Sequence, residues 1–344
     1  MAEYVNVAVD AMGGDNAPAE IVKGAVEAVN ADKRVKVFLV GKEPVIREEL
    51  KAYSYDAEQL EVVHAEEVIE TAEPPVMAIR RKKDSSIVKA MYMVKNGECD
   101  AFVSAGSTGA VLVGGQVIVG RIRGVERPPL APLIPTEKGV SLLLDCGANV
   151  DARPSMLVQF AKMGSVYMEK VQGISRPRVG LLNIGTEEHK GTEGHENAYR
   201  LLSGMKNIHF VGNIEPTALP QSPCDVLVAD GFSGNILLKT LEGMCRYIFK
   251  SIQGALASSS LPDEGKYASG RILKQVSGRF DASEHGGAPL IGISAPVIKA
   301  HGNSDARAIK NAIRQALRYA ESNAIAEIEE GIKGADLPKE HTPG

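Results

Sequence analysis

The stretch VAVDAMGGDNAPAEIV, residues 7–22, decides the fold because it combines a buried strand, a glycine turn and the start of a helix. VAVD has the small and β-branched residues of a strand, and the following segment has helical spacing, with Pro18 near its first turn. Gly13 and Gly14 permit torsions and close approaches that a side chain forbids, so a small ligand can reach the N–H groups that open the helix. For this stretch alone, a tight strand-to-helix turn is the commoner explanation.

The same order of apolar run, small or polar turn and helical segment recurs along the chain. The runs YVNVAVD, VKVFLV, AFVS, VSLLLD, VGLLNI and DVLVAD are each followed by a turn that contains glycine. This alternation predicts the α/β fold class, with a mostly parallel sheet and helices on both of its faces. Ligands of such sheets bind beyond the carboxyl ends of the strands, and the chain ends its runs there with Asp10, Ser104, Asp145, Asn183 and Asp230. Several helix N-termini at this edge predict a cleft that favours an anion.

Composition argues against several classes of protein. The formal net charge of -4 gives no overall reason to bind nucleic acid. The four cysteines form no C-x-x-C pair, so we expect neither a zinc site nor a disulfide framework, and a cytoplasmic location is the simplest setting. The beginning of the chain does not resemble a signal peptide. Residues 101–120 are uncharged, but their glycines and hydroxyl residues favour a buried strand, turn and helix over a membrane span.

Known nucleotide and hydrolase motifs are not present. No G-x-G-x-x-G follows a strand, and GTEEHKGT, residues 185–192, has Lys190 and Gly191 in the reverse of the P-loop order. No G-x-S-x-G elbow occurs. The loop aspartates have no recognised ligand spacing, so we expect no metal and no cofactor.

A few cations lie near the glycine loops. Lys190, Lys239 and His301 are the candidates, together with the run RRKK at residues 80–83. Each has an ordinary explanation as a solvated loop residue, a helix-surface residue or a charge that offsets a helix dipole. His301 stands out slightly because it ends an apolar run and precedes a capped helix.

Nine segments occur in order from about residue 5 to about residue 325: VAVDAMGGDNAP, RRKKDSS, SAGSTGA, RPPLAPLIPT, LLLDCGANVDARP, QFAKMGSVY, RPRVGLLNIGTEEHKG, ADGFSGNILLKTLEG and APVIKAHGNSD. Together they closely resemble the bacterial phosphate acyltransferases of phospholipid synthesis, the PlsX family. The resemblance implies transfer of a long acyl chain from acyl carrier protein to inorganic phosphate, which gives acyl phosphate. It also implies a homodimer and a fold related to isocitrate and isopropylmalate dehydrogenases and to phosphotransacetylase.

The residues are compatible with this reaction. Inorganic phosphate is already a nucleophile, so the protein has to strip it of water, hold it in line with a thioester carbonyl and stabilise the oxyanion. From their positions we expect the catalytic residues to be Lys190, His301 and Asn235. We expect the phosphate or substrate to be bound by Asp10, Gly13, Gly14, Asp15, Ser107, Thr108, Asn149, Asp230 and Ser233.

A basic segment is the candidate partner surface. Residues 240–280 predict a protruding helical hairpin joined by SSSLPDEGK, and acyl carrier proteins are acidic. The basic residues expected to meet them are Arg246, Lys250, Lys266, Arg271 and Lys274. In the resembling family this hairpin is associated with the dimer interface and with peripheral membrane contact. The short polar tip does not favour a membrane anchor, and a solvated hairpin that only helps the subunits pair is the simpler alternative.

We expect residues 1–333 to form a single catalytic domain that ends in one helix over 308–332, and residues 334–344 to be a disordered tail. Three other functions stay open. They are a phosphotransacetylase that uses short acyl-coenzyme A, a metal-dependent 2-hydroxy-acid dehydrogenase on the related fold, and a noncatalytic scaffold that binds acyl carrier protein and membrane.

Overall fold

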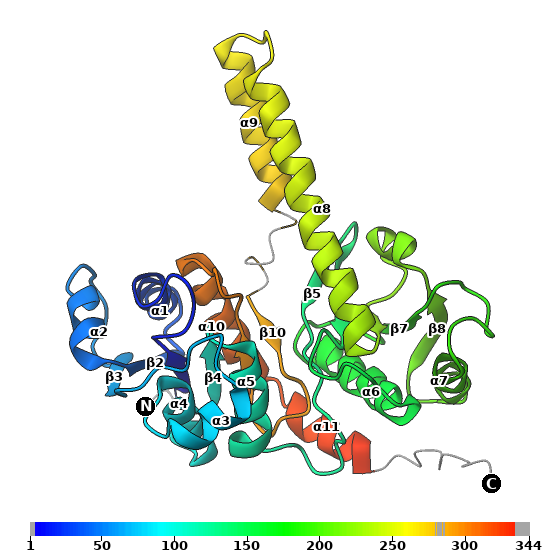
Figure 1. The fold of residues 1–344 in the computed structure, drawn as a ribbon, viewed down its shortest axis with the longest axis horizontal. Helices are drawn as coiled ribbons and strands as arrows, with labels where there is room; N and C mark the ends of the chain where they lie inside the picture. Colours follow the sequence, from blue (N-terminus) through cyan, green and yellow to red (C-terminus); the bar gives the residue numbers. More distant parts are fainter. Residues whose placement is uncertain (1–3, 279, 281–283, 285, 334–344) are drawn as a thin grey trace.

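The computed structural model describes residues 4–278, 280, 284 and 286–333, so the tail at 334–344 lies outside the described residues. Parallel strands alternate with helices, which confirms the predicted α/β class (Figure 1). The strands form two sheets, whereas a single sheet was expected. The reason is that pairing depends on contacts between distant segments: the strand 101–104 pairs with a strand near residue 298 and not with the next one along the chain.

The first sheet has the order β10-β11-β4-β1-β2-β3, and all of its pairings are parallel except that of β10 with β11. Its strands are β1 (Val5–Asp10), β2 (Val35–Gly41), β3 (Leu60–His64), β4 (Ala101–Ser104), β10 (Ala288–Pro289) and β11 (Val297–Lys299). The segments around it are α1 (Ala19–Ala31), α2 (Glu43–Leu50), α3 (Pro75–Arg81), α4 (Ser86–Lys95), α5 (Thr108–Gly114), η1 (Gly115–Val119) and α10 (Ala306–Glu321). Because β1 and β4 are central, their carboxyl ends lie in the middle of the sheet edge.

The second sheet has the order β5-β6-β9-β7-β8, and β5 is its antiparallel edge strand. Its strands are β5 (Leu133–Thr136), β6 (Gly139–Leu144), β7 (Arg178–Leu182), β8 (His209–Ile214) and β9 (Val226–Val228). The other segments are α6 (Pro154–Lys170), α7 (Glu193–Ser203), η2 (Pro216–Gln221), α8 (Gly231–Ala257), α9 (Asp263–Gly278) and α11 (Ala324–Lys333).

One hydrophobic core cluster runs through both sheets, and it includes β1 and β2 of the first sheet and β6, β7 and β9 of the second. Between them, Tyr167 of α6 and Tyr319 of α10 meet edge to face, with ring centroids 5.2 Å apart. The segment 128–131 ties the sheets together at the backbone. Ala131 N donates to Pro289 O at 3.0 Å, and Cys146 N donates to Leu130 O at 3.0 Å. The carboxyl ends of the two sheets are therefore held in a fixed relation.

The C-terminal segment forms two helices instead of the one helix that was predicted. Two helices, α10 and α11, occupy the region where one helix over 308–332 was predicted. Asn323 between them has φ of 56°, and Ser322 ends α10. A residue in the left-handed region cannot continue a right-handed helix, so the helix is interrupted at Asn323. The apolar spacing did not reveal this interruption because it continues with helical periodicity through both helices.

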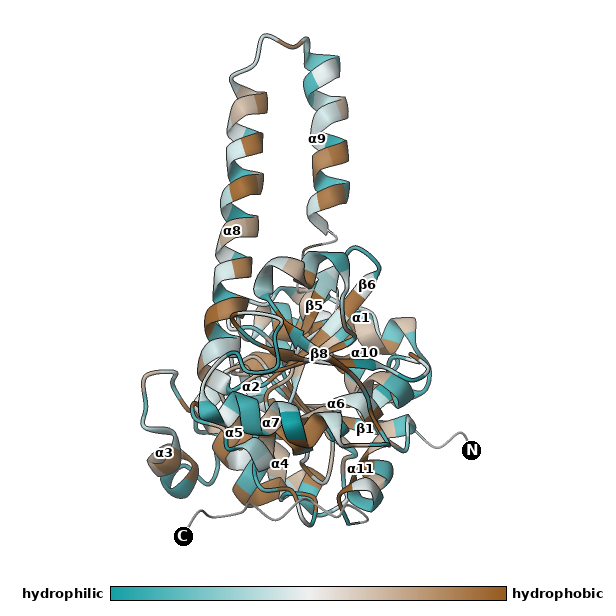
Figure 2. Cartoon of the chain, turned by 90° about the vertical axis from the view of Figure 1, so that its right-hand side faces the viewer, coloured by the Kyte–Doolittle hydropathy of each residue, from teal (hydrophilic) through white to brown (hydrophobic). Residues whose placement is uncertain are grey.

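The helices α8 and α9 project from the rest of the fold as an antiparallel pair (Figure 1). Only Gly231, Gly234 and Leu237 of α8 are buried, all in its first two turns. Figure 2 shows apolar and polar residues interspersed along both helices. Met244, Tyr247 and Ile248 on the projecting part are 50%, 67% and 46% exposed. In the described residues, no helix is both long and apolar enough to cross a membrane.

The packing of α1 on α10 gives a stability prediction. A Cβ atom on Gly24 would come within 2.5 Å of Ala306 O and 2.7 Å of Ile309 Cβ, so Gly24→Ala should lower the free energy of unfolding by about 1–3 kcal/mol. At Gly331 in α11 an added Cβ meets nothing within 4 Å, so Gly331→Ala should be neutral or slightly stabilising. Urea denaturation of both variants measures the difference, and equal stabilities would contradict this account of the helix contact.

Candidate active site

Three loops meet at the carboxyl ends of β1, β4 and β11, and we call residues 11–18, 105–107 and 300–305 the first loop cluster. A Cβ atom on Gly13 would come within 2.1 Å of Asp10 Oδ2 and 2.7 Å of Gly106 N. Gly14 has φ of +107°, and a Cβ there would lie 3.0 Å from Gly302 O. The backbone N–H of Asp15 donates to the same carbonyl at 2.7 Å. The two glycines are therefore required for the loops to touch.

Backbone donors remain free in this cluster. Among the described residues, the amide N–H groups of Gly13, Gly14, Ser107 and Thr108 have no acceptor. Ser107 is buried and caps α5, since its Oγ accepts from Ala110 N at 3.4 Å, whereas Thr108 is exposed. Unpaired amides beside a glycine turn are suited to binding an anion.

Asp10, the last residue of β1, is 1% exposed and does not face solvent. Ser104 Oγ donates to Asp10 Oδ2 at 2.7 Å and accepts from Gly106 N at 2.9 Å, while Met12 N donates to Asp10 Oδ1 at 3.2 Å. Burial raises the pKa of Asp10, and the hydrogen bonds from Ser104 and Ser86 oppose that rise. The contacts make Asp10 a residue that positions the first two loops.

Lys299, the last residue of β11, belongs to this cluster and was missed by sequence reasoning. Its side chain is 7% exposed, and Nζ donates to Ala105 O at 3.4 Å and also to Ala300 O. Burial lowers the pKa of Lys299 to about 8, and the charges of Asp10 and Asp15 oppose the fall. The available signal was a lysine inside the apolar run APVIKA, where a buried strand was expected to carry no charge.

Two further candidate residues of the cluster have exposed side chains. Asp15 and His301 both lie at its surface, on either side of the contact between Asp15 N and Gly302 O. His301 Nδ1 accepts from Asn303 N at 3.4 Å. In a neutral imidazole this leaves the proton on Nε2, where it is available to a bound molecule.

A second loop cluster lies at the carboxyl ends of β6, β7 and β9, and it comprises residues 145–153, 183–192 and 229–230. Asp145 organises it. Its Oδ1 accepts from Leu130 N at 2.8 Å and Cys146 N at 2.6 Å, and its Oδ2 accepts from Asn149 N at 2.5 Å and Asn149 Nδ2 at 3.0 Å. Burial raises the pKa of Asp145 to about 6 despite these hydrogen bonds. Asn149 is therefore held in the loop by Asp145.

The N-terminus of α8 packs on this loop. Asp230 is its N-cap and accepts from Ser233 N at 2.8 Å, while Gly231 N donates to Asn149 O at 2.7 Å. A Cβ atom on Gly234 would come within 1.9 Å of Asp145 O, so the helix can sit this close only with glycine there. Asn235 is exposed beside Gly147. Asp230 and Ser233 thus form a helix cap, and Asn235 is the exposed amide beside it.

Lys190 lies at the carboxyl end of β7. Its Nζ is 3.9 Å from Glu187 Oε1, and its carbonyl accepts from Asn183 Nδ2 at 2.9 Å. The structure therefore places Lys190 and Asn235 in the second cluster and His301 in the first. The expected catalytic roles of these three residues stay predictions.

The two clusters are close enough to interact electrostatically through α8. Lys239, one turn after Asn235, helps to lower the pKa of Lys299 and also acts on the thiol of Cys146. Its own ion pair is with Glu242 at 2.8 Å. Within the described residues, no group of three or more His, Cys, Asp or Glu side chains is placed to hold a metal ion.

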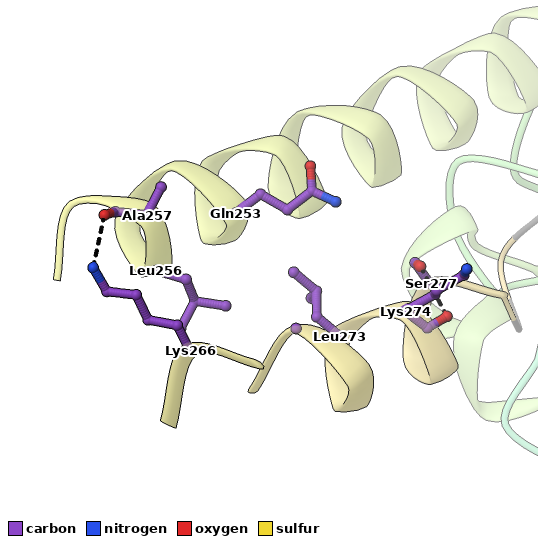
Figure 3. A pocket seen from close by; sticks show the side chains of 8 residues that line it. Gln253, Leu256, Ala257, Lys266, Leu273, Lys274 and Ser277 are labelled. Carbon is purple, nitrogen blue, oxygen red and sulfur yellow. Dashed lines mark hydrogen bonds between the residues drawn. The ribbon is translucent and has the colours of Figure 1, made fainter. Parts of the chain in front are cut away.

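The basic residues of the hairpin fall into two groups. Arg246, Lys250 and Arg271 are exposed. Lys266 and Lys274 line a groove of about 510 Å³ between α8 and α9, together with Leu256 and Leu273 (Figure 3). Lys266 Nζ donates to Ala257 O at 3.3 Å, as the dashed line shows, so this ammonium also stabilises the C-terminus of α8.

The fold and the site define an α/β protein with free backbone donors and a buried lysine at the carboxyl ends of parallel strands. Residues 5–327 match the family described as "Fatty acid synthesis protein". The "Phosphate acyltransferase" of Clostridium beijerinckii is 47% identical over 94% of this chain and 98% of its own, and the "Putative phosphate acyltransferase" of Clostridium perfringens strain 13 is 46% identical over 95% and 97%. The chain belongs to this fatty acid synthesis protein family.

Solved structures show the same fold. The "EutD phosphotransacetylase from Staphylococcus aureus" superposes with a TM-score of 0.60 at 18% identity and covers 92% of this chain and 94% of its own. A phosphotransacetylase from Streptococcus pyogenes gives the same TM-score and identity over 94% of both chains. The expected relation to the phosphotransacetylase fold is confirmed.

The contact at Gly13 predicts a loss of function. In Gly13→Ala the methyl group would displace either the Asp10 carboxylate or the Gly106 backbone, so phosphate-dependent turnover should fall by about 100-fold. The release of free thiol from an acyl thioester in the presence of phosphate measures this turnover. Gly204→Ala is the matched control, because its Cβ would meet nothing closer than 3.6 Å. Full activity of Gly13→Ala would show that the loops do not need this contact.

The hydrogen bonds of Asp145 predict a loss of stability. Asp145→Asn turns an NH2 group toward backbone donors, so the free energy of unfolding should fall by about 2–3 kcal/mol. Asp230→Asn is the control, since asparagine is an equally good N-cap for α8. Chemical denaturation compares them, and equal stabilities would remove Asp145 from its organising role.

Proposed function

We propose that this chain is a phosphate acyltransferase that moves a long-chain fatty acyl group from acyl carrier protein to inorganic phosphate and produces acyl phosphate for phospholipid synthesis. The observation that carries the proposal is the 46–47% sequence identity, over nearly the whole chain, with curated relatives that are named phosphate acyltransferases. The free amides of the first loop cluster support it, because they offer donors to a small oxyanion. The hydrophobic core cluster that includes strands of both sheets supports one catalytic domain over the described residues up to 333.

The reaction needs little acid–base chemistry. A phosphate oxygen forms a bond to the thioester carbonyl carbon, the C–S bond breaks, and the thiolate of the carrier leaves. Holding phosphate in line contributes about 7–11 kcal/mol in favourable intramolecular cases, whereas one oxyanion donor contributes about 3–4 kcal/mol. A hydrogen bond from His301 Nε2 would stabilise the departing thiolate, and Asn235 and Lys190 would offer further donors from the second cluster. Positioning therefore dominates over proton transfer.

Exposed apolar side chains favour a long acyl donor over short acyl-coenzyme A. Val150, Ile184, Phe232 and Ile236 are 65%, 81%, 59% and 52% exposed. They follow the neighbouring strands β6, β7 and β9, so they gather at the same edge as Asn149 and Asn235. An acyl chain laid on this edge would bury apolar surface at about 25 cal/mol per Å².

The hairpin supports two further parts of the proposal. The exposed Arg246, Lys250 and Arg271 offer a positive surface to acidic acyl carrier protein. The exposed Met244, Tyr247 and Ile248 favour a homodimer in which a second copy covers this face of α8. Leu261 is the one large apolar residue at the tip, residues 258–262, which supports subunit pairing more than peripheral membrane contact. The proposed location is the cytoplasm.

The reaction itself is testable directly. With palmitoyl acyl carrier protein, phosphate, EDTA and no nucleotide, we expect saturable release of thiol matched by acyl phosphate. Turnover of acetyl-coenzyme A alone would favour the short-chain transferase. Dependence on a nucleotide and a metal would favour the 2-hydroxy-acid dehydrogenase, and binding without turnover would favour a scaffold.

The hairpin surface predicts a separate effect on the carrier. The double variant Arg246→Glu with Lys250→Glu should raise the KM for palmitoyl acyl carrier protein by at least about 10-fold and leave the KM for phosphate unchanged. The double variant Arg47→Glu with Lys51→Glu, at the exposed C-terminal end of α2, changes the net charge by the same amount and is the control. An unchanged carrier KM in the double variant would place the docking surface elsewhere.

A further inference from the structure

Lys299, Ser104 and Asp10 form a polar row across three neighbouring strand ends. Lys299 of β11 is the register partner of Ser104 of β4, and Ser104 Oγ donates to Asp10 Oδ2 at 2.7 Å. Register partners on adjacent strands point to the same side of a sheet. The row therefore brings a lysine and an aspartate to the first loop cluster.

The Lys299 ammonium is only partly satisfied. Two carbonyl groups, Ala105 O and Ala300 O, accept from Nζ, and its third hydrogen has no acceptor among the described residues. A neutral side chain would hold the same carbonyls at a lower desolvation cost, since a buried charge costs several kcal/mol unless it is compensated. The charge is thus the feature that the loop contacts leave unexplained.

The charged groups that act on Lys299 come from three directions. They are Asp10 of β1, Asp15 of the β1–α1 loop and Lys239 of α8. Neither carboxylate forms an ion pair with Lys299 among the described residues, because Asp10 is held by Ser104 and Met12 while Asp15 is exposed at the surface. An anion bound in the first loop cluster would be able to pair with the ammonium directly.

We propose that Lys299 binds inorganic phosphate with its remaining N–H and its charge, together with the amides of Gly13, Gly14 and Ser107. This inference rests on the proposed function for the identity of the anion. Lysine supplies a point charge and the amides supply direction, a combination suited to phosphate. The bonds to Ala105 and Ala300 fix the ammonium, so it needs no rearrangement when phosphate arrives.

The experiment is a calorimetric titration of the full chain with inorganic phosphate, in the absence of any acyl donor. Lys299→Gln keeps donors for the two carbonyls but removes the charge, so we expect phosphate to bind at least about 10-fold more weakly. The control variant Lys51→Gln, at the exposed residue that follows α2, should bind phosphate as the original chain does. In turnover, Lys299→Gln should raise the KM for phosphate and leave the KM for the acyl carrier unchanged. Phosphate affinity within about twofold of the original would overturn the proposal.

A second arm needs no variant and applies even where Lys299→Gln fails to fold. Above about pH 8 inorganic phosphate is mostly a dianion, and deprotonation of Lys299, whose pKa is about 8, should weaken phosphate binding by about 15-fold between pH 8 and about pH 9.5. Constant affinity across this range would overturn the proposal. Phosphate binding without acyl phosphate formation would reject the proposed reaction while leaving the role of Lys299 intact.

Discussion

The contact between Gly13, Asp10 and Gly106 is the constraint on which the first loop cluster depends. A hydrogen in place of a side chain at Gly13 lets two loops from distant parts of the sequence approach the same buried carboxylate. Ser104 then links that carboxylate to the backbone of the second loop. Because the loops satisfy each other in this way, the amides of Gly13, Gly14, Ser107 and Thr108 have no acceptor within the part of the chain that the structure describes.

At the second sheet, the loops and the start of α8 are held together by Asp145. Asp145 collects backbone N–H groups from the segment 128–131 and from its own loop, and the first turn of α8 rests on its carbonyl through Gly234. The same segment is hydrogen-bonded to Pro289 in the first sheet. A long helix is thus anchored at the site by its N-terminus, and its far half is free to meet a partner. One continuous helix therefore joins the second loop cluster to the hairpin.

The sequence predicted six of the strands, β1, β2, β4, β6, β7 and β9, because buried parallel strands are short apolar runs that end at glycine turns. YVNVAVD, AFVS and VSLLLD became β1, β4 and β6, and the uncharged region 101–120 became a strand followed by helical turns. The division into two sheets was not predictable, since it depends on which distant strands pair. Lys299 was overlooked for a related reason: its neighbours Asp10 and Ala105 lie far from it in the sequence. Lys190 and His301 were grouped by residue type, yet they belong to different loops.

Direct attack of a positioned phosphate on the thioester is the central claim, and isotope labelling tests it most directly. The chain would be incubated with palmitoyl acyl carrier protein and inorganic phosphate that carries ¹⁸O at all of its oxygens, and the acyl phosphate would be analysed by mass spectrometry. Direct attack predicts that every labelled oxygen is retained, because the phosphate oxygen itself forms the new bond to carbon. Loss of one labelled oxygen would show that phosphorus was attacked instead, and would contradict the account.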